Sequence, residues 1–219
     1  MKEMIVTIRK ILRIAVLAGM ILFTGCRQTA EASGQLPLDI RARFGGIEIT
    51  DTAYWDSPES TWFVLIRTPD RTNILLCFVL ENGTWTQKFQ TDTAVPQGED
   101  RVSILFTDQV KESTDGRTET KPILTILQYG TGDDASVPQR QYEFLRTSPG
   151  VWELIRAQFT EAQLRLEISE DAVIFLLPTG EEIRTDIPAG LDRDLRRTDL
   201  AGIPATPEEA EAPLAVPAD

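Results

Sequence analysis

The chain has 219 residues, of which 34 are acidic and 22 basic, giving a formal net charge of −12. A chain this acidic is not expected to bind nucleic acid, because contact with phosphates requires a basic surface. It contains no histidine and only two cysteines, Cys26 and Cys77, which excludes a Ser-His-Asp triad, a histidine-bound metal and a thiolate-bound zinc or iron–sulfur centre, so we predict no cofactor.

The first 26 residues have the layout of a secretory signal. A basic leader containing Lys2, Arg9, Lys10 and Arg13 precedes an uncharged apolar run from Ile14 to Phe23. About 20 apolar residues are needed to cross a bilayer, so this run is too short for a permanent membrane span.

Small residues and a cysteine follow the apolar run. Thr24, Gly25 and Cys26 resemble the lipobox of bacterial lipoproteins, although Phe23 stands where leucine is usual. The resemblance covers only residues 1–26. It implies a signal peptide over residues 1–25 and lipidation of Cys26, which becomes the mature N-terminus. The alternatives are an ordinary secretory signal with an incidental cysteine, and an uncleaved helix at the membrane interface.

The lipoprotein resemblance also implies a location. Several acyl chains on one protein give stable anchoring, so the membrane is an expected partner through the N-terminal lipid. The residue after Cys26 is Arg27 and not aspartate, which implies outer-membrane sorting in a diderm bacterium. In a monoderm bacterium the same anchor places the protein on the outer face of its cell membrane.

Composition divides the rest of the chain into three segments. Residues 26–35 carry the lipidated cysteine and a polar, flexible tether. Residues 36–187 form a body of single-domain size. Residues 188–219 are rich in proline, alanine and glutamate, and we expect a disordered tail there.

The body follows a period of two residues, which is typical of β-strands with one solvated face. Leu164 to Ser169, Ile40 to Phe44 and Ile47 to Thr50 alternate in this way. The runs Trp62 to Ile66 and Ile74 to Leu80 are apolar at every position, which indicates central strands covered on both faces.

Turn residues link these strands into a meander. Asn82-Gly83 is the preferred pair of a two-residue type I′ hairpin, and Pro149-Gly150 fits a type II turn. The segment 151–162 fits either a strand or a helix, and we favour the strand. We therefore predict an all-β fold, a single antiparallel meander domain of about ten strands, arranged as a sandwich or a small barrel.

Few residues suggest chemistry. Cys77 lies in an apolar strand and is expected to be buried. The acidic turns at residues 113–116 and 132–134 lack the spacing of an EF-hand loop, so we interpret them as turns and predict no metal site. Tyr54 and Trp55, beside the turn Ser57-Pro58, are the best candidates for an exposed ligand-stacking pair.

These observations favour a lipid-anchored, non-catalytic protein that binds or scaffolds an envelope protein or a glycan outside the cytoplasm. A carbohydrate- or small-ligand-binding module that uses Tyr54 and Trp55 is the first alternative. A hydrolase acting through paired carboxylates is the second.

Overall fold

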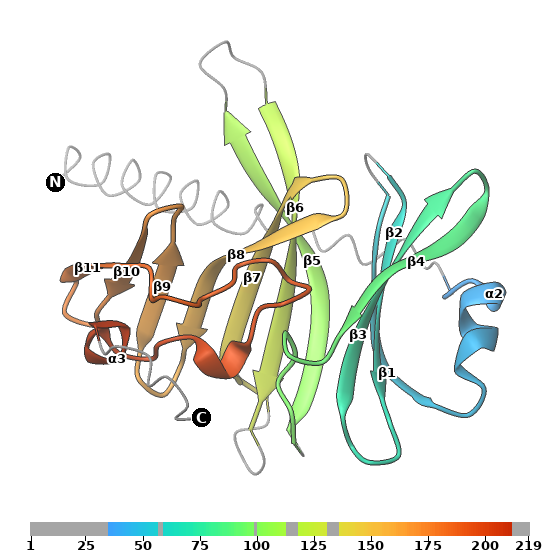
Figure 1. Ribbon diagram of the computed structural model, residues 1–219, viewed down its shortest axis with the longest axis horizontal. Helices are drawn as coiled ribbons and strands as arrows, with labels where there is room; N and C mark the ends of the chain where they lie inside the picture. Colours follow the sequence, from blue (N-terminus) through green and yellow to red (C-terminus); the bar gives the residue numbers. More distant parts are fainter. Residues whose placement is uncertain (1–34, 57–58, 99, 113–117, 131–135, 212–219) are drawn as a thin grey trace, which may run out of the picture. The chain divides into compact units, whose positions relative to one another are not determined.

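The computed structural model describes residues 35–56, 59–98, 100–112, 118–130 and 136–211, which belong to one compact unit. In this part of the chain, eleven strands form two antiparallel sheets (Figure 1). The all-β meander expected from the sequence is therefore confirmed, and its two sheets give a sandwich-like arrangement. No helix among these residues is long and apolar enough to cross a membrane.

The first sheet is a four-stranded meander. Its strands follow one another in the order β1 (Glu48–Trp55), β2 (Thr61–Arg67), β3 (Asn73–Glu81) and β4 (Thr84–Thr91). β2 and β3 occupy the middle of the sheet and are almost completely buried, as their continuous apolar runs predicted. Asn82 and Gly83, with φ of 51° and 77°, form the two-residue turn between β3 and β4.

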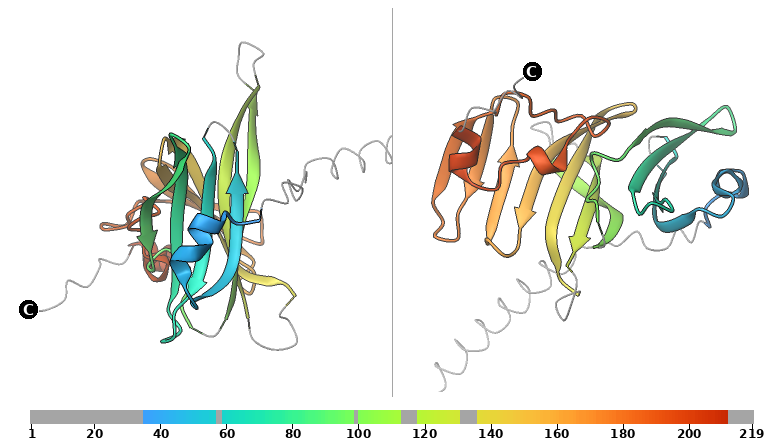
Figure 2. Two further views of the ribbon diagram at one scale, coloured as in Figure 1. Left: turned by 90° about the vertical axis from the view of Figure 1, so that its right-hand side faces the viewer. Right: turned by 60° about the horizontal axis from the view of Figure 1, so that its bottom comes forward.

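The second sheet is a seven-stranded meander. Its strands are β5 (Arg101–Glu112), β6 (Thr118–Tyr129), β7 (Pro138–Ser148), β8 (Val151–Phe159), β9 (Leu164–Ile168), β10 (Ala172–Leu176) and β11 (Glu182–Asp186). The ambiguous segment 151–162 is thus a strand over most of its length. β5 lies beside β1 of the first sheet. Figure 2 shows the two sheets from two further directions.

A short helical segment covers the outer face of the first sheet. It consists of α2 (Leu38–Arg41) and the 3₁₀ turn η1 (Ala42–Phe44), so the strand predicted over residues 40–44 is wrong. Ile40 and Phe44 are four residues apart, a spacing that fits one face of a helix as well as alternate positions of a strand. Both pack on β2 and β3 in a small core cluster that includes Trp62 and Phe78.

The main hydrophobic core lies between the two sheets. Phe63 of β2 contacts Phe106 of β5 and Trp152 of β8, with ring centroids 5.7 and 5.3 Å apart. Aromatic rings at this separation prefer edge-to-face packing. Such pairs stabilise the fold by more than the apolar area that they bury. The sheets are therefore joined through their inner faces as well as along β1 and β5.

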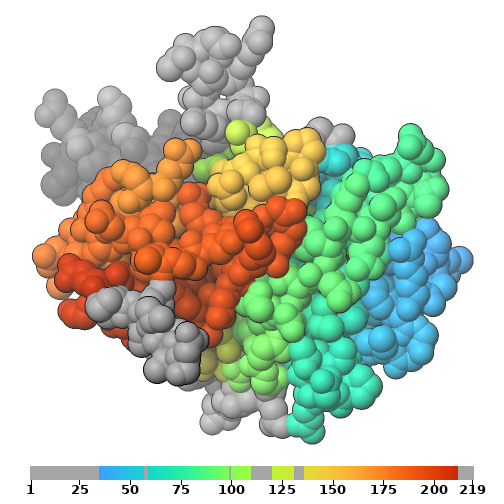
Figure 3. All heavy atoms as spheres, in the orientation of Figure 1, coloured from blue at the N-terminus to red at the C-terminus, as the bar shows by residue number. Residues whose placement is uncertain are grey.

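The C-terminal segment closes one side of this core. The disorder expected from residue 188 is wrong for residues 188–211, while residues 212–219 lie outside the described residues. The segment includes η2 (Leu200–Gly202) and α3 (Pro207–Glu211), and it buries Leu195, Leu200 and Ile203 in the main core. Figure 3 shows it in orange to red against the green segment that follows β4.

Backbone pairing on β8 explains why this segment is ordered. β9 pairs only with residues 156–159 of β8. The backbone groups on that edge of the first half of β8 are therefore available to another segment. There Leu154 donates its N–H to the carbonyl of Arg193, and Leu195 donates to that of Trp152, both at 2.8 Å. Satisfying these backbone groups holds the segment in place despite its polar composition.

Candidate functional site

Tyr54 and Trp55 lie next to each other on β1, so their side chains point to opposite faces of the sheet. Tyr54 packs on the outer cluster, with its ring centroid 4.9 Å from that of Trp62, and its hydroxyl donates to Asp56 Oδ1 at 2.6 Å. Burial is the main cause that raises the pKa of Tyr54. Trp55 instead packs against the main core. The structure does not bring the predicted pair onto one surface.

Cys77 is completely buried in the main core, as predicted. Burial raises the pKa of its thiol to about 12, so the reactive thiolate is scarce at neutral pH. Cys26 and both acidic turns at 113–116 and 132–134 lie outside the described residues. Within the described part of the chain, no group of acidic residues and cysteine is suited to hold a metal ion.

Several of the partly buried carboxylates interact with arginines. Glu143 pairs with Arg156 at 2.6 Å, and Glu153 pairs with Arg193 at 3.3 Å. Asp194 is buried, and its pKa is lowered chiefly by a hydrogen bond from Arg196. A general acid needs a raised pKa to hold its proton near neutral pH, whereas the pKa of Asp194 is lowered.

A recess of about 710 Å³ opens where the ends of both sheets meet the C-terminal segment. We call it the mouth recess. Four segments that are distant in sequence line it, namely residues 70–72 of the β2–β3 turn, residues 92–98, the facing ends of β6 and β7, and residues 199–201. Leu200 donates its N–H to the carbonyl of Thr93 at 3.1 Å and joins two of these segments.

The mouth recess combines apolar walls with a few polar groups. Val95, Pro96 and Leu200 supply apolar surface. Tyr142 is almost completely buried, and this burial raises the pKa of its hydroxyl despite the opposing effect of Arg140. Small-ligand sites typically show this combination in a space of roughly 300–1,000 Å³.

Gln128 provides the clearest polar feature of the recess. Its Nε2 donates to Asp100 Oδ2 at 2.6 Å, whereas its buried Oε1 has no hydrogen-bond partner among the described residues. A buried acceptor without a donor is costly. A ligand N–H or O–H that reached this oxygen would remove the cost.

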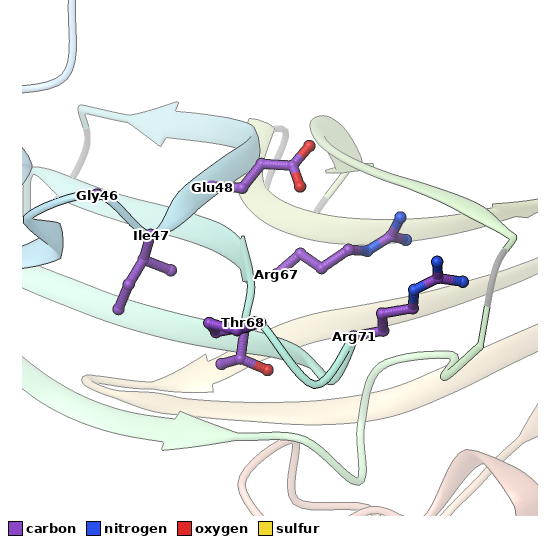
Figure 4. A pocket seen from close by; sticks show the side chains of 7 residues that line it. Gly46, Ile47, Glu48, Arg67, Thr68 and Arg71 are labelled. Carbon is purple, nitrogen blue, oxygen red and sulfur yellow. The ribbon is translucent and has the colours of Figure 1, made fainter.

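Figure 4 shows a second, more polar recess of about 590 Å³. We call it the arginine groove. Gly46, Ile47 and Glu48 line it from the start of β1, and residues 67–69 with Arg71 line it from the β2–β3 turn. Arg71 lines both recesses.

The sequence alone did not reveal either recess. Residues 92–98 have no regular secondary structure, yet Ala94, Val95 and Pro96 are buried. The apolar triplet Ala94-Val95-Pro96 was the available signal, because exposed loops seldom contain consecutive apolar residues. The contribution of residues 199–201 was missed because the C-terminal segment was interpreted as disordered.

The sequence matches no protein-family model, no curated protein and no solved structure.

Proposed function

We propose that this chain is a lipid-anchored, non-catalytic binding protein of a bacterial cell envelope, facing outside the cytoplasm, and that the mouth recess holds its small ligand. The single observation that carries the proposal is that Gln128, which lines a recess of ligand size, has a buried Oε1 with no hydrogen-bond partner among the described residues. The membrane attachment is supported by the resemblance of residues 1–26 to a lipoprotein signal.

The chemistry of the recess supports a ligand with both apolar and hydrogen-bonding groups. Val95, Pro96 and Leu200 favour an apolar face, and Gln128 requires a donor. Fragments of an envelope glycan carry sugar faces, amide N–H groups and hydroxyls, so they meet these requirements. A protein partner bound over the same end of the sheets is the second candidate, because the recess is open to solvent.

The anchor is tested by feeding cells an alkynyl palmitate and measuring its incorporation into the chain. We expect labelling of the native chain and none of Cys26→Ser. A native chain without label, or equal labelling of Cys26→Ser, would show that Cys26 is not lipidated.

The recess is tested with Ala201→Phe, which places a ring in it without removing a core contact, since Ala201 is exposed. Ala162→Phe, at an exposed turn position between β8 and β9, is the matched control. The full chain in neutral detergent is titrated with soluble disaccharide–peptide fragments of the cell wall, and thermal unfolding is followed.

A saturable rise of the unfolding temperature in the native chain and Ala162→Phe, lost in Ala201→Phe, is the expected result. If the native chain shows no rise, the glycan-fragment proposal is overturned and the protein partner becomes the leading candidate. An equal rise in Ala201→Phe would place the ligand elsewhere.

A further inference from the structure

Arg67 differs from the other half-buried arginines of the described chain. Four of them form an ion pair with a glutamate: Arg146 with Glu59, Arg156 with Glu143, Arg165 with Glu167 and Arg193 with Glu153. Within the described residues, no carboxylate forms an ion pair with Arg67. This is unexpected in a chain with 34 acidic residues, because a partly buried charge is normally paired.

Neutral groups hold the Arg67 guanidinium in place. Its Nε donates to Asn73 Oδ1 at 3.0 Å, and its Nη2 donates to the carbonyl of Asp100 at 3.1 Å. Asn73 is itself completely buried, and its Nδ2 donates to the carbonyl of Pro96 at 2.8 Å. The guanidinium is thus oriented by neutral acceptors, and no carboxylate of the described residues forms an ion pair with it.

Arg71 brings a second positive charge to the same groove from an unusual backbone position. Its φ of 67° lies in the left-handed region, which glycine or asparagine adopts at lower cost. Hydrogen bonds across the turn fix it there, including those from Arg71 N–H to the carbonyl of Thr68 at 2.9 Å and from Thr68 N–H to that of Thr72 at 3.0 Å. Both residues line the groove, and in Figure 4 their side chains extend in the same direction.

The acidic groups around the groove are mostly engaged elsewhere. Asp51, at the adjoining edge of β1, accepts backbone N–H groups from Thr52 and Ile104, both at 2.8 Å. Asp70 accepts the Thr68 hydroxyl, and Asp100 accepts Gln128 Nε2. Among the residues that line the groove in the described part of the chain, Glu48 is the one carboxylate; it is exposed and stands opposite Arg67 in the β1–β2 pairing.

We propose that the arginine groove binds an oxyanion, a carboxylate or a phosphate group, between Arg67 and Arg71. A guanidinium offers two parallel N–H donors to such a group, and charge-assisted bonds of this kind are stronger than neutral ones. The anion supplies Arg67 with a counter-charge, since none of the described carboxylates forms an ion pair with it. Glu48 repels it across the groove and limits its affinity. This site does not depend on the ligand proposed for the mouth recess.

The test is a titration of the full chain in neutral detergent with potassium phosphate and, separately, with sodium acetate. Chloride keeps the ionic strength constant, and the shift of the thermal unfolding midpoint reports binding. We expect a saturable stabilisation of the native chain. The oxyanion with the lower dissociation constant identifies the group that the groove prefers.

Three variants and a control distinguish this site from general charge effects. We expect Arg71→Gln and Arg67→Lys to weaken binding by about tenfold, because the first removes a charge and the second removes the paired donors. Glu48→Gln should tighten binding by about threefold, because it removes a like charge. Arg184→Gln, which removes an exposed arginine paired with Asp171, should leave the affinity unchanged.

The proposal is overturned if neither oxyanion stabilises the native chain beyond chloride, or if Arg184→Gln weakens binding as much as Arg71→Gln. Opposite effects of Glu48→Gln and Arg71→Gln would support it even when both variants are slightly less stable. Ala201→Phe fills the mouth recess and not the groove, so oxyanion binding that persists in this variant separates the two sites.

Discussion

Asp51 Oδ2 accepts a hydrogen bond of 2.8 Å from the backbone N–H of Ile104, and this bond joins β1 of the first sheet to β5 of the second. Asp51 follows an irregularity in the β1–β2 pairing, between Ile49 and Asp51. Its Oδ1 accepts the N–H of Thr52, also at 2.8 Å. A side chain therefore connects the two sheets at a place where β1 and β5 have no regular ladder.

Replacing Asp51 with alanine tests the contribution of this connection. We expect Asp51→Ala to lower the free energy of unfolding by about 1–3 kcal/mol, because the N–H of Ile104 loses its acceptor in a partly buried place. Urea unfolding measures the change. Asp108→Ala, at an exposed position of β5, is the control and should stay within about 0.5 kcal/mol of the native chain. Equal losses in both variants would contradict the role assigned to Asp51.

The packing of the C-terminal segment leads to a second prediction. Leu195 is completely buried in the main core, so Leu195→Ala should lower the free energy of unfolding by about 2–5 kcal/mol through lost burial and a cavity. Leu38→Ala is the matched control, because Leu38 is 82 % exposed. Urea unfolding of the two variants should therefore differ clearly. A Leu195→Ala variant as stable as Leu38→Ala would mean that the segment is not packed in solution.

The strand meander was predictable because its signals are local. Alternation in Leu164 to Ile168, the apolar run in β3 and the turn residues Asn82 and Gly83 each depend on neighbours in sequence. Two errors arose where a local pattern fits more than one structure. Ile40 and Phe44 suit both a strand and a helix, and the polar composition around Leu195 and Leu200 hid the apolar residues that pack on the core.

The candidate sites depend on contacts between distant segments, which no local pattern reports. Arg67 and Asp100 are 33 residues apart and meet in the arginine groove. Gln128 and Leu200 line the mouth recess from different parts of the chain. The sequence pointed instead to Tyr54 and Trp55 because adjacent aromatic residues beside a turn are locally conspicuous. Because successive side chains of a β-strand point to opposite faces, Tyr54 and Trp55 lie on different sides of the sheet.

The lowered pKa of Asp194 leads to a third prediction, on the pH dependence of stability. A hydrogen bond from the Arg196 side chain is the largest cause of the lowering, and the charges of Arg196 and Arg197 add to it. Because the carboxyl has a lower pKa in the folded chain than in the unfolded chain, its contribution is complete above the unfolded value of about 3.9. It is lost as the pH falls through the folded value.

Asp194→Asn removes this titration while keeping a side chain of similar size. At pH 7 the variant should be less stable than the native chain by about 1–3 kcal/mol, because charge-assisted hydrogen bonds from Arg196 are weakened. This difference should shrink steadily once the pH falls below about 4. Urea unfolding between pH 7 and pH 3 measures it, with Asp186→Asn at an exposed position of β11 as the control. A difference between Asp194→Asn and the native chain that stays constant over this range would show that the carboxylate of Asp194 does not stabilise the fold through its charge.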